Sequence, residues 1–87
     1  MYIIMVYDIK IERVFKVLKI ARKYLTWVQN SVLEGEITGA KLERLKSELN
    51  KVIDPEEDSV VFYKLRTTNY FTKEVMGIEK GREDVVI

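Results

Sequence analysis

The sequence predicts an α+β domain in which two helices cover one face of a single antiparallel sheet. Three observations support this class. The chain has 87 residues, enough for one small domain. Its composition, 47% hydrophobic and 33% charged, is typical of a folded globular protein. Its hydrophobic pattern changes from a strand-like run to a helical period and back along the chain.

The first two elements are predicted by local pattern. Residues 2–7 form a continuous run of β-branched and aromatic side chains that stops at Asp8, which indicates a central strand buried on both faces. Between residues 12 and 24 the apolar side chains recur at helical spacing, and neither Gly nor Pro interrupts them. The positions that share this apolar stripe are Val14, Val17, Leu18 and Ala21.

The middle of the chain predicts more strand and a second helix. Residues 25–37 return to a period of two, as either one bent strand or a tight pair of strands. We expect an irregularity at residues 29–31, and Gly35 could supply a bulge or kink. Thr38 is the expected N-cap of the second helix. We expect Asp54-Pro55 to end it, because the residue before proline disfavours the helical conformation. Its apolar positions are Leu42, Leu45, Leu49 and Val52.

Residues 58–65 alternate in the manner of a last main strand, so the element order is that of the ferredoxin-like βαββαβ plan. We expect residues 1–65 to form this domain and residues 66–87 to form a C-terminal segment. Within that segment, residues 67–71 are β-prone and the apolar ending at 85–87 is expected to cover another subunit. The open face of such a sheet is expected to be covered by homodimerisation.

Composition restricts the chemistry. The chain has no cysteine and no histidine, which excludes disulfides, thiol catalysis and His-based dyads. An enzyme built from this chain would depend on carboxylate, hydroxyl, phenol, Lys or Arg, with a hard metal ion such as Mg²⁺. The N-terminal apolar run is too short for a signal peptide, and no stretch is long enough to span a membrane, so a cytoplasmic location is expected.

Asp8 is the candidate catalytic and metal-binding residue, since side chains at the end of a strand reach solvent. A carboxylate there, with Tyr7 beside it, can ligate Mg²⁺ and orient a water for attack on a phosphodiester. One carboxylate is a poor Mg²⁺ site, and two brought together across a two-fold axis would be better. The alternative is an Asx-turn or capping aspartate that leads into the helix, which is the commoner role for such a residue taken alone.

The first helix and the loop before it are strongly basic, with a net charge of +5 on a chain whose total is +1. Lys16, Lys19 and Lys23 share one helical face, and such a stripe can follow a phosphate backbone. The alternative is an ordinary solvated face. The basic residues from 10 to 24 are Lys10, Arg13, Lys16, Lys19, Arg22 and Lys23.

Two other features have both a structural and a functional interpretation. Residues 54–58 contain four acids, which could bind a metal but more often form a solvated loop. Trp27, beside Gln29, could stack on a base, although a lone Trp on a strand more often belongs to a core or interface.

Four segments together resemble the CRISPR-associated protein 2 family. They are the strand end at residues 7–9, the basic helix, the block at 27–36 and the acidic turn at 54–60. They occur in the family's order and at suitable spacing, and the resemblance runs from residue 1 to about residue 65.

The resemblance implies a homodimer of ferredoxin-like protomers in which Asp8 and the partner's Asp8 share a Mg²⁺ ion across the dimer axis. Tyr7 would neighbour this site, Arg13 would be the helix arginine near substrate, and the C-terminal segment would add a strand to the partner protomer. Members are described as metal-dependent endonucleases acting on RNA or double-stranded DNA. They are also described as the non-catalytic dimer that bridges two dimers of the CRISPR-associated protein 1 integrase.

The sequence departs from the family pattern at two positions. Trp27 stands where many members have arginine, and Leu33 stands where phenylalanine commonly follows Ser-Val. Both positions are linked to nuclease activity, so these departures weaken the endonuclease hypothesis more than the bridging one. A third hypothesis, a ferredoxin-like regulatory domain, is disfavoured by the absence of a Gly-rich ligand loop in the sequence.

Overall fold

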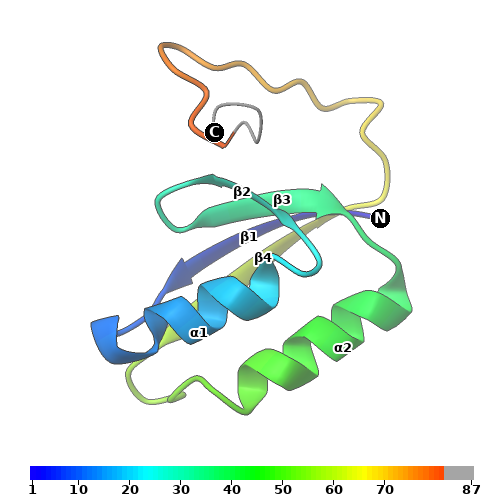
Figure 1. The fold of residues 1–87 in the computed structure, drawn as a ribbon. Helices are drawn as coiled ribbons and strands as arrows, with labels where there is room; N and C mark the ends of the chain where they lie inside the picture. The colour runs from blue at the N-terminus through cyan, green and yellow to red at the C-terminus, as the bar shows by residue number, and fades with distance from the viewer. Residues whose placement is uncertain (82–87) are drawn as a thin grey trace.

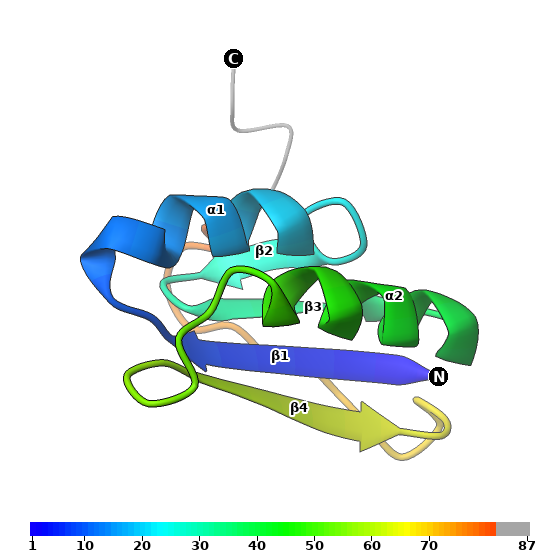
Figure 2. The same cartoon turned by 90° about the horizontal axis from the view of Figure 1, so that it is seen from below.

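The four strands of the computed structural model, which describes residues 1–81, form one antiparallel sheet in the order β2-β3-β1-β4. Both helices lie on the same face of this sheet (Figures 1 and 2). The predicted α+β class and ferredoxin-like βαββαβ order are therefore confirmed. The elements are β1 (Tyr2–Asp8), α1 (Ile11–Ala21), β2 (Thr26–Gln29), β3 (Val32–Glu36), α2 (Gly39–Asn50) and β4 (Ser59–Leu65).

β1 is central, since it pairs with β3 on one side and with β4 on the other. Its odd-numbered side chains, Ile3, Met5 and Tyr7, are buried under the helices, whereas the even-numbered ones are only half-buried or exposed. The expectation that this strand is buried on both faces is therefore wrong for a single chain. The even positions belong to a face of the sheet that carries no helix (Figure 1), which we call the helix-free face.

Both helices occur where the apolar spacing predicts them, but each ends early. α1 ends at Ala21, and the residues up to Tyr24 form a turn. Thr38 caps α2 as expected, because its hydroxyl accepts a hydrogen bond from the Lys41 backbone N–H at 3.2 Å. α2 ends at Asn50, well before Pro55, so the proline is not what stops it.

The segment 25–37 is a pair of strands joined by a tight turn rather than one bent strand. Asn30 supplies the turn with a φ of 45°, a left-handed conformation that Asn adopts more readily than most residues. The register shift lies between Trp27 and Gln29 in β2, at the edge of the predicted irregularity at residues 29–31, and not at Gly35.

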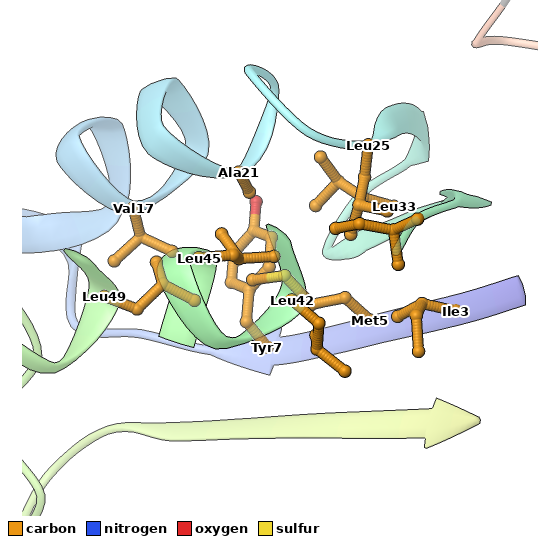
Figure 3. Packing of buried hydrophobic residues seen from close by; sticks show 11 residues of the cluster. Ile3, Met5, Tyr7, Val17, Ala21, Leu25, Leu33, Leu42, Leu45 and Leu49 are labelled. Atoms are coloured by element: carbon orange, nitrogen blue, oxygen red, sulfur yellow. The ribbon is translucent and has the colours of Figure 1, made fainter. Parts of the chain in front are cut away.

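The core lies between the sheet and the two helices (Figure 3). Side chains from β1 and β3 meet the apolar stripes of α1 and α2, whose spacing the sequence shows. The largest fully buried side chains are Ile3, Met5, Val17, Leu33, Leu42 and Leu45.

Residues 66–81 pass across the side of the sheet opposite the helices (Figure 1). The Phe71 ring lies 5.5 Å from the Tyr2 ring, and Lys73 forms a 2.7 Å ion pair with Glu34 of β3. The β-prone residues 67–71 form no strand. The apolar ending at 85–87 lies outside the described residues, so its predicted contact with another subunit stays a prediction.

Candidate functional site

Asp8 is the last residue of β1 and lies on the helix-free face, directly opposite Ser59 of β4. Its side chain is exposed. Among residues 1–81, no side chain forms a hydrogen bond or ion pair with this carboxylate. The alternative that Asp8 caps the first helix is not what the structure shows, because the N-cap of α1 is Lys10.

Tyr7 does not lie beside the Asp8 carboxylate within one chain. Its ring is in the core, 8% exposed, and its hydroxyl donates a 3.3 Å hydrogen bond to the Asn30 carbonyl (Figure 3). Burial raises the pKa of the phenol. Because successive side chains of a strand point to opposite faces, Tyr7 and Asp8 are separated by the sheet itself.

Asp58 is the buried carboxylate of the acidic turn, and its side chain is fully covered. It accepts hydrogen bonds from two backbone N–H groups, those of Lys10 at 2.9 Å and Asp54 at 2.8 Å. It also accepts two from Arg13, from Nε at 2.6 Å and from Nη2 at 3.1 Å. The interpretation of residues 54–58 as a wholly solvated loop is therefore wrong for Asp58.

The guanidinium of Arg13 is engaged by carboxylates, since it also binds Glu57 at 3.0 Å. These hydrogen bonds raise the pKa of Arg13, and those of Arg13 and the two backbone amides hold the pKa of Asp58 far below its usual range. The family resemblance would place the Arg13 guanidinium near nucleic acid. In the structure it instead links α1 to the acidic turn.

The Arg13–Asp58 pair also fixes the surroundings of Asp8. Asp58 directly precedes Ser59, which pairs with Asp8, and it holds the backbone N–H of Lys10, two residues after Asp8. A carboxylate at the first turn of a helix is also favoured by the helix dipole. The buried side chain of Asp58 therefore holds the loop that follows Asp8 and adjoins the start of β4, which pairs with Asp8.

The basic residues of α1 and its entry loop fall into two groups, those paired with a carboxylate and those that are not paired within residues 1–81. Lys23 forms a 2.5 Å ion pair with Glu48 of α2, which raises the pKa of Lys23 and lowers that of Glu48. Lys10, Lys16 and Lys19 are exposed, and no carboxylate of residues 1–81 forms an ion pair with them. Of the residues predicted to contact nucleic acid, these three keep their ammonium groups available to a phosphate backbone.

A single Asp8 fits Mg²⁺ only as one ligand of a larger set. No group of three or more Asp, Glu, His or Cys side chains among residues 1–81 is arranged to hold a metal ion. Mg²⁺ is commonly held by one or two carboxylates and keeps several of its waters. An exposed carboxylate to which no side chain of residues 1–81 bonds matches one such ligand.

Trp27 and Leu33, the two departures from the family pattern, are cross-strand neighbours. Leu33 is fully buried under the helices, and Trp27 packs against the core while its indole N–H donates a 3.0 Å hydrogen bond to the Asn30 carbonyl. Both side chains belong to the helix-covered face. Neither position therefore lies on the same face as Asp8 within one chain.

Comparison with known proteins identifies the family. A family model described as "CRISPR associated protein Cas2" matches residues 1–73. The chain belongs to the Cas2 family. Two relatives, both named "CRISPR-associated endoribonuclease Cas2", come from Dictyoglomus turgidum, 56% identical over all of both chains, and Thermotoga maritima, 55% identical over 99% of each.

Solved structures agree with the Cas2 fold. One described as "Crystal structure of cas2" has a TM-score of 0.84 and 41% identity, over 100% of this chain and 98% of the other. Streptococcus pyogenes Cas2 has a TM-score of 0.74 and 30% identity, over 87% of this chain and 100% of the other. None of the helices in residues 1–81 has the length and apolar character that crossing a membrane requires.

Proposed function

We propose that this Cas2-family chain is a homodimeric, Mg²⁺-dependent endonuclease acting on RNA or DNA, with Asp8 as its metal ligand. The observation that supports this most is the state of Asp8 itself. It is an exposed carboxylate to which no side chain of residues 1–81 bonds, at the end of the central strand and beside a loop that buried hydrogen bonds hold in place.

The helix-free face supports the dimer. Near Asp8 this face is apolar, with Ile4 opposite Tyr63 and Val6 opposite Val61 across the β1–β4 pair. Tyr63 is 58% exposed and Val61 is 41% exposed. A second copy packed on this face would cover those side chains and bring its own Asp8 towards the first.

The described residues provide separate parts of the proposed chemistry. Bound Mg²⁺ would polarise the scissile phosphate and lower the pKa of an attacking water. Asp8 would hold the ion, and the backbone contacts around Lys10 and Ser59 would keep the carboxylate in place. Lys10, Lys16 and Lys19 would bind phosphates through charge, without reading sequence.

The test is cleavage of RNA and of double-stranded DNA by purified wild-type protein and Asp8→Asn, with and without Mg²⁺. Loss of the metal ligand should slow cleavage at least about 100-fold. The matched control is Glu56→Gln in the exposed part of the acidic turn, which should cleave at the wild-type rate. Equal rates for Asp8→Asn and the wild type would remove the endonuclease proposal.

A second candidate function is a non-catalytic bridge that binds duplex DNA and the CRISPR-associated protein 1 integrase. It is favoured by the exposed lysines of α1 and by the departures at Trp27 and Leu33. It predicts that spacer acquisition in cells survives Asp8→Asn. Acquisition that disappears in Asp8→Asn, while the purified variant still binds DNA and the integrase, would exclude a purely architectural role.

A further inference from the structure

One flank of α1 combines exposed apolar side chains with positive charge. Ile11 is 81% exposed and Phe15 is 80% exposed, and they lie one helical turn apart on the same face. Phe15 also lines a shallow groove of about 360 Å³. We call this surface the α1 flank; its residues are Ile11, Phe15, Leu18, Lys19 and Arg22.

The α1 flank is distinct from the contacts that hold α1 in the fold. Val17 and Ala21 bury the core side of the helix. Arg13 points to the acidic turn before β4, and Lys23 pairs with α2. In Figure 2, α1 lies over the β2 side of the sheet with α2 on its other side, so the outer flank faces away from α2.

The lysine of the α1 flank, Lys19, forms no ion pair within residues 1–81. The carboxylates that pair with α1 across the fold are Glu57 and Asp58 in the acidic turn and Glu48 in α2. None of them forms an ion pair with Lys16 or Lys19. The α1 flank would therefore attract the acidic groups of a ligand through Lys19, and the apolar side chains of the same ligand through Ile11 and Phe15.

A nucleic-acid backbone matches only half of this surface. Phosphates would pair with Lys19, but they gain nothing from covering Ile11 and Leu18, and aliphatic side chains offer no stacking platform for a base. A protein segment with acidic residues beside an apolar stripe matches both halves, in the manner of an amphipathic helix on a hydrophobic groove.

We propose that the α1 flank is a docking surface for an acidic, amphipathic segment of a protein partner. The proposal rests on the bridging function for the choice of partner, the CRISPR-associated protein 1 integrase, which is the probe of the test. The occupant itself is defined by its chemistry: carboxylates for Lys19 and apolar side chains for Ile11 and Phe15.

The test is titration of the purified full-length chain with purified integrase, followed by calorimetry. Phe15→Ser should weaken binding at least about 10-fold, as expected for an aromatic anchor of an interface, and Lys19→Glu should weaken it in the same direction. The matched control is Tyr70→Ser, since Tyr70 is an exposed aromatic residue outside α1. A thermal melt checks folding, which substitution at an exposed Phe15 should leave intact.

The outcomes separate this proposal from the bridging function. If the wild-type chain does not bind the integrase, the bridging function fails, and so does this choice of occupant. If the wild-type chain and Phe15→Ser bind equally, the bridge stands and the docking site is overturned.

Three further outcomes would assign the α1 flank to another occupant and overturn the proposal. Equal losses of duplex DNA binding and integrase binding in Phe15→Ser would assign it to nucleic acid. If Phe15→Ser elutes as a monomer on size-exclusion chromatography where the wild type elutes as a dimer, the α1 flank would be assigned to a second copy of the chain. A change in the Phe15 amide resonance of the free protein on Val86→Asp would assign it to the chain's own C-terminal segment.

Discussion

Asp8 and Asp58 are two carboxylates beside the same loop with opposite environments. Asp8 is exposed, and no side chain of residues 1–81 bonds to it. Asp58 is buried and accepts four hydrogen bonds, from Lys10, Asp54 and both Nε and Nη2 of Arg13. A carboxylate whose lone pairs are already occupied stabilises a fold, whereas one that keeps them available can bind a ligand.

The comparison also separates the basic residues. Arg13 and Lys23 form ion pairs with carboxylates of their own chain, whereas Lys10, Lys16 and Lys19 form none with residues 1–81. Charge counted along the sequence treats all five as equivalent. Their contacts divide them into residues that hold α1 in place and residues that remain for a polyanion.

The largest expected difference is in stability. Asp58→Asn should lower the free energy of unfolding strongly, because it leaves the Arg13 guanidinium without its main partner in a part-buried site. Asp8→Asn should change the free energy of unfolding by no more than about 0.5 kcal/mol, as an exposed substitution. Urea unfolding followed by circular dichroism measures both. Equal losses in the two variants would mean that Asp8 also has a structural role.

The pH dependence of stability should follow Asp58. Its pKa is depressed in the folded state, so the stabilisation is fully present above the unfolded value and is lost as pH falls through the folded value. The free energy of unfolding of the wild type should therefore fall as pH drops below about 4. Asp58→Asn should show a shallower fall over the same range. Superimposable pH profiles would contradict the ionised Asp58–Arg13 pair.

A smaller effect is expected for nucleic-acid binding by α1. Replacing Lys16 and Lys19 with Gln should weaken duplex binding and reduce the slope of log K against log salt by about 2. The matched control replaces two exposed lysines, Lys41 in α2 and Lys51 at its C-cap, which gives the same net charge. Filter binding at several salt concentrations measures the slope. A slope reduced as much by the control would show that only net charge matters.

Arg13→Gln sharpens the same comparison. Since its guanidinium is engaged by Asp58 and Glu57, its loss should lower the urea midpoint and leave the salt slope unchanged. A reduced slope at unchanged stability would restore Arg13 to the nucleic-acid contacts that the family resemblance implies.

Local pattern was sufficient for the fold. The helical spacing of Val17 and Ala21 and of Leu42 and Leu45 predicts both helices, because the apolar stripe must face the sheet. The helix ends were less predictable, since the turn after Ala21 depends on how the chain enters β2. The opposite orientations of Tyr7 and Asp8 follow from strand alternation and could have been predicted from the sequence.

The role of Asp58 could not be predicted from local pattern. Its partners Lys10 and Arg13 lie 48 and 45 residues away in the sequence, so burial of its carboxylate depends on how α1 meets the turn before β4. Four neighbouring acids look alike in the sequence, and only tertiary contacts distinguish the buried one. The same holds for Lys23, whose partner Glu48 belongs to the other helix.

Titration of the purified homodimer with Mg²⁺ tests the central claim most directly. If Asp8 is the ligand-binding carboxylate and is shared between two copies, calorimetry should detect one ion per two chains. That binding should disappear in Asp8→Asn and persist in Glu56→Gln. Undiminished Mg²⁺ binding by Asp8→Asn would contradict the assignment of function to Asp8.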